Sequence, residues 1–268
     1  HTEPLGIDKN MPARFLLPLI DQKAASGFVN ASLALDQARA VKDIQEQELM
    51  RKASHLNDMA MAEITHFFKE GVTETDLAEQ LKKIYRDLGA DGLSFEPLFA
   101  FGSNAASGHH WPDDTRLKPG DCILVDIGCT WEGYCSDMTR TFFYKNVTQH
   151  QQEVYHTVLK ANEEAEKAVT PGIPLSSLDQ IARGIITDKG YGSAFTHRLG
   201  HFIGLEDHEF GDVSSASADR AVPGNIFSIE PGVYLENDMG VRVEDLVLVT
   251  DHGHEILNHF SKELTVID

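Results

Sequence analysis

An internal repeat constrains the fold of this chain more than any other feature of its sequence. Several glycines and apolar residues recur 101 positions later, and a Pro-Gly pair recurs 104 positions later. The matched positions are Gly71-Val72 with Gly172-Ile173, Leu77 with Leu178, Gly89 with Gly190, and Pro119-Gly120 with Pro223-Gly224. Each half also runs in the order helix, helix, hairpin. The repeat predicts an α+β fold, a curved antiparallel sheet backed by helices on one face, with the other face left free for a cleft.

Apolar spacing and turn residues predict the individual elements. Residues 1–40 show no long period and are predicted to be a connector with a short helix near residues 32–40. A helical stripe follows from residue 41 to Gly71, and Thr73 with Asp76 resembles a capping box before a second helix that Gly89 ends. We expect strands at 95–101, 121–127 and 137–144, with a turn at 128–133. In the second half we expect helices at 148–169 and 178–188, and strands at 226–230 and 241–250.

The charge balance limits the classes of partner. The chain has 268 residues, and 23 Lys and Arg face 42 Asp and Glu, which gives a formal charge of −19. Binding to nucleic acid or to an anionic membrane surface needs a basic surface, so both are excluded as partners. Three cysteines, Cys122, Cys129 and Cys135, are too few for a disulfide framework and show no Cys-x-x-Cys step. We interpret them as free thiols of a cytoplasmic protein.

Acidic residues occupy matched positions in the two halves. Asp126 and Asp137 lie on two arms of the first predicted hairpin, and Glu230 and Glu244 lie on the second. Strand alternation places Asp126 on the face opposite its apolar neighbours, and the same holds for the two glutamates. Four converging buried carboxylates need compensating positive charge, which two divalent cations supply. The alternative is that each acid is a solvated residue at a strand end.

Histidines cluster in two stretches of the chain. His197, His201 and His208 lie in one stretch, and glycines flank His201 and allow close approach of the backbone. His109 and His110 form the second cluster, in which one histidine of the pair has a structural role in the alternative interpretation. Together with the four acids, the first stretch indicates a metal site.

Five separated motifs resemble those of the pita-bread (M24-type) metallopeptidases, which include methionine aminopeptidase, aminopeptidase P and prolidase. The motifs are Leu124-Val-Asp-Ile-Gly128, Ser136-Asp-Met-Thr-Arg140, Gly200-His-Phe-Ile-Gly204, Ser228-Ile-Glu-Pro-Gly232 and Val241-Arg-Val-Glu-Asp245. They occur in the family's order, and the resemblance runs from about residue 41 to the C-terminus. It implies the duplicated pita-bread fold and a catalytic domain at residues 41–268.

The resemblance also implies roles for individual residues. A dinuclear metal centre is implied at Asp126, Asp137, His201, Glu230 and Glu244. The implied catalytic residues are Glu230, which would also move a proton, and His109 and His208, which would donate hydrogen bonds to the peptide and the tetrahedral intermediate. His109, His197 and His208 are implied to contact the substrate, and Arg242 to orient the ligands from behind. For Arg242 the alternative is a surface salt bridge. Four oxygen donors and one imidazole favour Mn²⁺, with Co²⁺, Zn²⁺ or Fe²⁺ as alternatives.

The segment before Arg51 sets the expected branch of the family. Residues 38–51 resemble the linker that follows the N-terminal domain of prolidases and aminopeptidases P, so residues 1–40 are expected to be the end of an upstream domain and its linker. The expected activity is Xaa-Pro dipeptidase (prolidase-like) hydrolysis, with short peptides bearing proline at the second position as substrates, and the family suggests a homodimer. The alternatives are aminopeptidase P or methionine aminopeptidase activity, and a non-catalytic peptide-binding module. His110-Trp111, where Gly often follows His109, and Phe202 depart from the family pattern.

Overall fold

The first half of the body is a pair of helices on a small antiparallel sheet. The structure, a computed structural model, describes residues 2–268, so residue 1 of the predicted connector lies outside it. The helices are α3 (Ile44–Thr65) and α4 (Glu74–Leu88), and the main strands are β4 (Leu98–Phe101), β5 (Cys122–Ile127) and β8 (Met138–Tyr144). These three strands pair antiparallel, and β16 (Val266–Ile267) joins β8 in parallel. A smaller sheet holds β3 (Gly92–Leu93), β6 (Cys129–Trp131) and β7 (Tyr134–Cys135), and η1 (Gly102–Ala106) follows β4.

The second half repeats this order. Its helices are α5 (Gln149–Ala168) and α6 (Leu175–Asp188), followed by the short η2 (Gly192–Ala194). A five-stranded antiparallel sheet has the order β10-β9-β11-β14-β15. Its strands are β9 (Gly200–Phe202), β10 (Glu209–Val213), β11 (Ile226–Ile229), β14 (Asp245–Val249) and β15 (His254–Ile256), and a hairpin of β12 (Gly232–Leu235) and β13 (Met239–Arg242) leads from β11 to β14. The predicted α+β duplication is therefore confirmed.

Helix caps form where local sequence predicts them. Thr73 and Asp76 make the reciprocal bonds of a capping box at the start of α4, although Asp replaces the usual Glu or Gln. Gly89 ends α4 in the left-handed conformation, with φ of 82°. Thr148 caps α5 in the same way as Thr73 caps α4. These caps explain why α4 and α5 begin close to their predicted residues.

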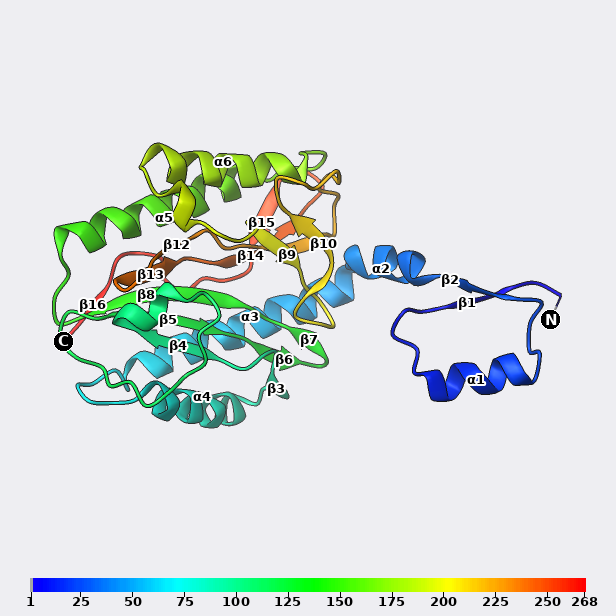
Figure 1. Ribbon diagram of the computed structural model, residues 1–268, viewed down its shortest axis with the longest axis horizontal. Helices are drawn as coiled ribbons and strands as arrows, with labels where there is room; N and C mark the ends of the chain where they lie inside the picture. The colour runs from blue at the N-terminus through cyan, green and yellow to red at the C-terminus, as the bar shows by residue number, and fades with distance from the viewer. Residues whose placement is uncertain (1) are drawn as a thin grey trace.

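Figure 1 shows the strands of both halves between the α3–α4 pair and the α5–α6 pair. The two faces of β5 enter different cores, as alternation predicts. Ile123 and Val125 belong to the apolar cluster that includes residues of α3 and α4, whereas Cys122 and Leu124 belong to the cluster that includes residues of β13, α5 and α6. Cys122 and Leu124 are buried, so the face that was expected to be free for a cleft is covered along most of β5 and reaches the cleft at Asp126, near the end of the strand.

Two local predictions are also wrong. Residues 128–133 are not one turn, because β6 pairs with β3 and β7, and only Glu132 and Gly133 form the tight reversal. Residues 241–250 are not one strand, because the chain leaves β13 after Arg242 and enters β14 at Asp245. The break occurs where the chain passes from the β12–β13 hairpin to the larger sheet, and it places Val243 and Glu244 between the two sheets.

The N-terminal residues form an arm that extends from the body in Figure 1. Strands β1 (Leu5–Ile7) and β2 (Phe28–Asn30) pair in parallel around α1 (Ala13–Asp21), and α2 (Ser32–Ala40) follows at the residues predicted for a short helix. Helix α1 was not predicted, because Pro12 and Pro18 indicate breaks. Pro12 instead takes the N-cap position, where a missing N–H leaves no helical bond unmade. No residue of α1 is buried.

Within residues 2–268 no helix combines the length and the apolar character needed to cross a membrane.

Candidate metal centre

A cleft of about 460 Å³ opens where the strands of the two halves end. All nine site residues predicted from the sequence line it: His109, Asp126, Asp137, His197, His201, His208, Glu230, Arg242 and Glu244. They come from both halves of the duplication. The cleft therefore collects residues that lie up to 135 positions apart in the sequence, from His109 to Glu244.

The four acids are held at strand ends on the seam between the halves. Asp126 lies near the end of β5, opposite Thr139 of β8, and Asp137 directly precedes β8. Glu230 follows β11, and Glu244 lies in the break between β13 and β14. The seam itself is hydrogen-bonded, since the backbone N–H of Glu244 donates to the carbonyl of Thr139 over 3.1 Å. The hydroxyl of Thr139 also donates to Oε2 of Glu244 over 2.6 Å.

Three of these carboxylates have a buried oxygen without a partner. Oδ1 of Asp126, Oδ1 of Asp137 and Oε1 of Glu244 accept no hydrogen bond within the described part of the chain. Buried polar atoms are nearly always paired, because leaving one unpaired costs about 1–3 kcal/mol. Three unpaired carboxylate oxygens facing one cleft therefore fit the binding of cations.

His201 supplies a nitrogen donor to the same place. Its Nε2 lies 3.4 Å from Oδ2 of Asp137 and 3.6 Å from Oε1 of Glu230. Its Nδ1 lies 3.2 Å from the carbonyl oxygen of Phe202, which favours the proton on Nδ1 and leaves the Nε2 lone pair free. Burial lowers the pKa of His201 to about 4, so the ring is neutral at pH 7. Ligand atoms of Asp137, His201 and Glu244 lie within 4.8 Å of one another.

Without cations the acids repel one another. Burial, above all, raises the pKa of Asp137 and of Glu244 well above the usual range, and the neighbouring carboxylates add to this effect. Burial raises the pKa of Glu230 to about 7, with Arg242 opposing and Asp126 reinforcing the shift. The protein alone therefore does not supply enough positive charge to keep all four acids ionised.

Arg242 is buried and contacts the candidate ligand Asp126 directly. Its Nη2 donates to Oδ2 of Asp126 over 2.5 Å, and its Nε donates over 2.9 Å to the hydroxyl of Thr139. Arg242 therefore does not form a salt bridge on the strand surface, because only 3% of the residue is exposed. Its Nη1 donates to the phenol oxygen of Tyr234 over 2.7 Å. Sequence reasoning missed Tyr234, although residues 230, 232 and 234 alternate onto one face of an extended chain.

The two histidines of the second cluster separate in the structure. Nε2 of His110 lies 2.7 Å from Oε2 of the fully buried Glu74, so His110 has a structural contact. His109 lines the cleft and is exposed. The sequence left open which of the pair is structural. Both histidines line the cleft, and the contact with Glu74 favours the structural role for His110.

The other two histidines, His197 and His208, have different partners in the cleft. Nε2 of His197 lies 3.0 Å from the phenol oxygen of Tyr234, and burial lowers the pKa of His197 to about 4. His208 is exposed, and its ring stacks on His201 with centroids 3.8 Å apart. Its Nδ1 lies 2.7 Å from Oδ2 of Asp207, and this bond raises the pKa of His208. Asp207 also lines the cleft and was not predicted.

Comparison with known proteins assigns this geometry to a family. Residues 48–251 match the family described as "Metallopeptidase family M24". The chain belongs to metallopeptidase family M24. An uncharacterized peptidase of Staphylococcus aureus (strain MW2) is 41% identical to it over 244 residues, which span 91% of this chain and 70% of that protein. As an M24 member, the chain is a peptidase.

Solved structures similar to this M24 peptidase have the same fold. A prolidase from Pyrococcus furiosus aligns with a TM-score of 0.92 and 33% identity, over 97% of this chain and 77% of that one. An X-Pro aminopeptidase from Thermotoga maritima aligns with a TM-score of 0.95 and 32% identity, over 99% of this chain and 76% of that one. A Xaa-Pro dipeptidase from Bacillus anthracis aligns with a TM-score of 0.94 and 30% identity, over 98% of this chain and 74% of that one. The predicted pita-bread fold is thereby confirmed.

Proposed function

We propose that this M24 peptidase hydrolyses the peptide bond before proline in short Xaa-Pro peptides, as a dipeptidase. The carrying observation is that four carboxylates and one imidazole converge in a single cleft, with three buried carboxylate oxygens left unpaired. The solved relatives named as a prolidase, an X-Pro aminopeptidase and a Xaa-Pro dipeptidase support the choice of substrate. Two of these three names indicate a dipeptidase.

Two divalent ions would be held by Asp126, Asp137, His201, Glu230 and Glu244. Four oxygen donors and one nitrogen donor support Mn²⁺ as the native metal, with Co²⁺, Zn²⁺ or Fe²⁺ as alternatives. When bound, such ions lower the pKa of water and polarise the scissile carbonyl.

The chain's own residues would complete the reaction. Glu230 would accept the proton that the attacking water loses and deliver it to the proline nitrogen as the peptide bond breaks. His208 and His109 would donate hydrogen bonds to the carbonyl oxygen as it gains negative charge, and His197 would contact the substrate. Arg242 would keep the carboxylate of Asp126 oriented through the bond described above.

We also propose the organisation of the whole protein. Residues 41–268 would be the catalytic domain, and residues 1–40 would belong with a preceding domain and its linker, which the exposed α1 supports. Three buried free cysteines support a cytoplasmic location. A homodimer is the proposed assembly, and sedimentation of the purified protein would test it.

The test of function compares substrates at one metal load. The Mn²⁺-loaded protein is assayed on a Xaa-Pro dipeptide, a Xaa-Pro tripeptide and a dipeptide without proline. We expect the highest kcat/KM on the Xaa-Pro dipeptide. Preference for the tripeptide would favour an X-Pro aminopeptidase, as in the Thermotoga maritima relative, and turnover confined to the peptide without proline would reject the proposal.

A further inference from the structure

We propose that residues 257–262, here called the C-terminal strap, position three of the five candidate metal ligands by fixing the backbone next to each of them. The strap lies behind the cleft, and none of its residues lines that cleft. It makes separate contacts to the segments that carry Asp137, Glu230 and Glu244. The inference rests on the metal site proposed above and adds residues that the known motifs do not contain.

Asn258 connects the strap with Asp137. Its Nδ2 donates to the backbone carbonyl of Asp137 over 3.2 Å, and its Oδ1 accepts the N–H of Leu246 over 2.7 Å. Asn258 is itself buried, with 4% exposed. The side-chain amide of Asn258 therefore links the segment of Asp137 in the first half with strand β14 in the second half.

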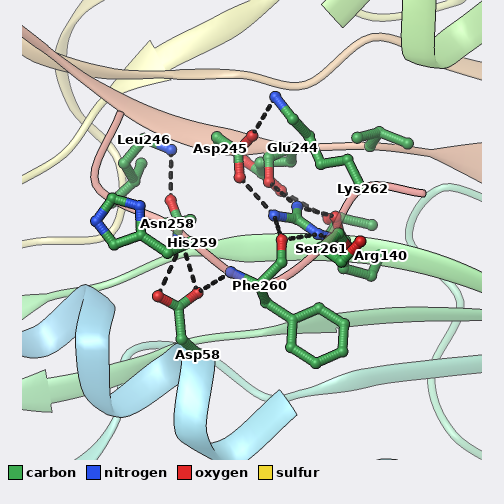
Figure 2. Close-up of polar contacts among 12 residues, drawn as sticks. Asp58, Arg140, Glu244, Asp245, Leu246, Asn258, His259, Phe260, Ser261 and Lys262 are labelled. Carbon is green, nitrogen blue, oxygen red and sulfur yellow. Dashed lines mark hydrogen bonds and ion pairs between the residues drawn. The ribbon is translucent and has the colours of Figure 1, made fainter. Parts of the chain in front are cut away.

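Arg140 connects the strap with Glu244, as Figure 2 shows. Its Nη2 donates to the carbonyl oxygen of Phe260 over 2.7 Å and to Oδ1 of Asp245 over 2.7 Å. Its Nη1 donates to the carbonyl oxygen of Glu244 over 2.6 Å. A rigid guanidinium suits this position, because it holds several acceptors in a fixed fork. Arg140 thus holds the backbone of Glu244, while the hydroxyl of Thr139 holds its side chain.

Lys262 connects the strap with the segment of Glu230. Its Nζ contacts Glu166, Asp245 and the Oδ1 of Asn162 at 2.7, 2.8 and 2.9 Å. Asn162 in turn donates from Nδ2 to the carbonyl oxygen of Ile229 over 2.9 Å. Ile229 is the residue before Glu230, so Lys262 fixes the amide that holds this ligand's backbone.

The strap is anchored to the first half at its other end. The carboxylate of Asp58 on α3 accepts the backbone N–H of His259 at 2.8 Å and that of Phe260 at 2.9 Å (Figure 2). The strap therefore spans from α3 in the first half to α5 in the second. Groups that hold ligands from a second layer typically change metal affinity by about 10- to 100-fold when removed.

The experiment measures Mn²⁺ affinity in two variants of Lys262. Lys262→Met removes the ammonium and keeps the aliphatic stem, whereas Lys262→Arg keeps the charge and the donors. Loss of a nearby positive charge would by itself strengthen cation binding. Loss of positioning would weaken it. We expect the Kd for Mn²⁺, from calorimetric titration of the metal-free protein, to rise about tenfold in Lys262→Met. Lys262→Arg should recover most of the affinity.

Asn258→Ala is the second variant, and Glu263→Gln, at an exposed residue next to Lys262, is the control. We expect Asn258→Ala to raise the Kd about tenfold and to change the visible spectrum of the Co²⁺-loaded protein, while the control does neither. Near-UV circular dichroism establishes that each variant is folded. Should both variants fold with lower Tm and bind Mn²⁺ as the wild type does, the strap is merely structural and the inference is wrong. Failure of the wild type to bind Mn²⁺ would instead reject the proposed metal site.

Discussion

Glu230 lies beside another candidate metal ligand and also reaches the cleft. Its Oε1 lies 3.6 Å from Nε2 of the candidate ligand His201, and it accepts a hydrogen bond from the hydroxyl of Ser228 over 3.3 Å. The side chain is 15% exposed toward the cleft, so a substrate can approach it. At the scale of the single residue, this position suits both roles proposed for Glu230, metal binding and proton transfer.

Glu230→Gln should therefore separate the two roles. The amide keeps one oxygen donor but takes up no proton, so kcat on a Xaa-Pro dipeptide should fall about 10²- to 10⁴-fold. Metal content, measured by mass spectrometry of the digested protein, should fall much less. The matched control is Glu236→Gln, an exposed acid on the same half. A kcat near that of the wild type in the metal-loaded variant would remove the proton-transfer role.

His208→Ala tests the proposed hydrogen-bond donor. Because the ring would stabilise charge that develops only during the reaction, kcat should fall about 10²-fold while KM changes less. The exposed His252→Ala serves as the control and should behave as the wild type. If the loss appears in KM alone, His208 binds the substrate and does not stabilise the transition state.

The second helix of each half places a buried acid against the segment that carries a cleft histidine. On α4, Glu74 accepts hydrogen bonds from the backbone of Phe101 and Asp113, on either side of His109. On α6, Asp179 pairs with Arg183, which donates to the carbonyl oxygen of His197 over 2.8 Å. At the scale of elements, the two halves thus share the order of their elements and also the use of a buried acid on the second helix to hold a cleft loop.

Asp179→Ala should loosen the His197 segment. It removes the partner of Arg183 and the acceptor of the Leu199 N–H. Breaking a buried pair from one side costs about 3–5 kcal/mol, and we expect about 2 kcal/mol here because a third of the Arg183 side chain is exposed. Denaturant unfolding measures the change. Glu164→Gln, in an exposed pair with Lys167, is the control and should leave the free energy of unfolding nearly unchanged. Equal losses of unfolding free energy in the two variants would show that the Asp179–Arg183 pair does not hold the His197 segment.

At the scale of the whole molecule, the proposed ions would join the two halves. Asp126 and Asp137 come from the first half, and His201, Glu230 and Glu244 from the second. Direct bonds across the seam near the ligands include the one from Glu244 to Thr139. Ions bound by both halves would therefore add to the cohesion of the fold and also relieve the repulsion between the acids.

Removing metal with a chelator should lower the Tm. Metal at about 100 times its Kd contributes about 2.7 kcal/mol, which corresponds to roughly 5–10 °C for a chain of this size. The gain should shrink as pH falls from about 7.5 to about 5.5, because protons compete with the ions for the ligands. Differential scanning calorimetry with and without Mn²⁺ measures both effects. An identical Tm in the two samples at pH 7.5 would contradict binding across the seam.

Local patterns in the sequence were sufficient for helices α2 to α6, for the caps of α4 and for the two faces of β5. Thr73 and Gly89 act within one turn of chain, and the alternation along β5 acts within one strand, so neighbouring residues encode them. The repeat then indicated that four acids share one site, and the family resemblance implied the remaining site residues. All nine predicted residues line the cleft for this reason.

Only the tertiary structure decided which distant partners complete that site. Tyr234 beneath Arg242, the bond from Asn258 to Asp137, and the assignment of His110 to Glu74 join residues separated by 8, 121 and 36 positions. The break of the 241–250 strand at Glu244 depends likewise on the sheet it leaves and the one it enters. The physical reason is that such contacts form when packing brings two segments together, and neither segment alone carries a periodic signal of its partner.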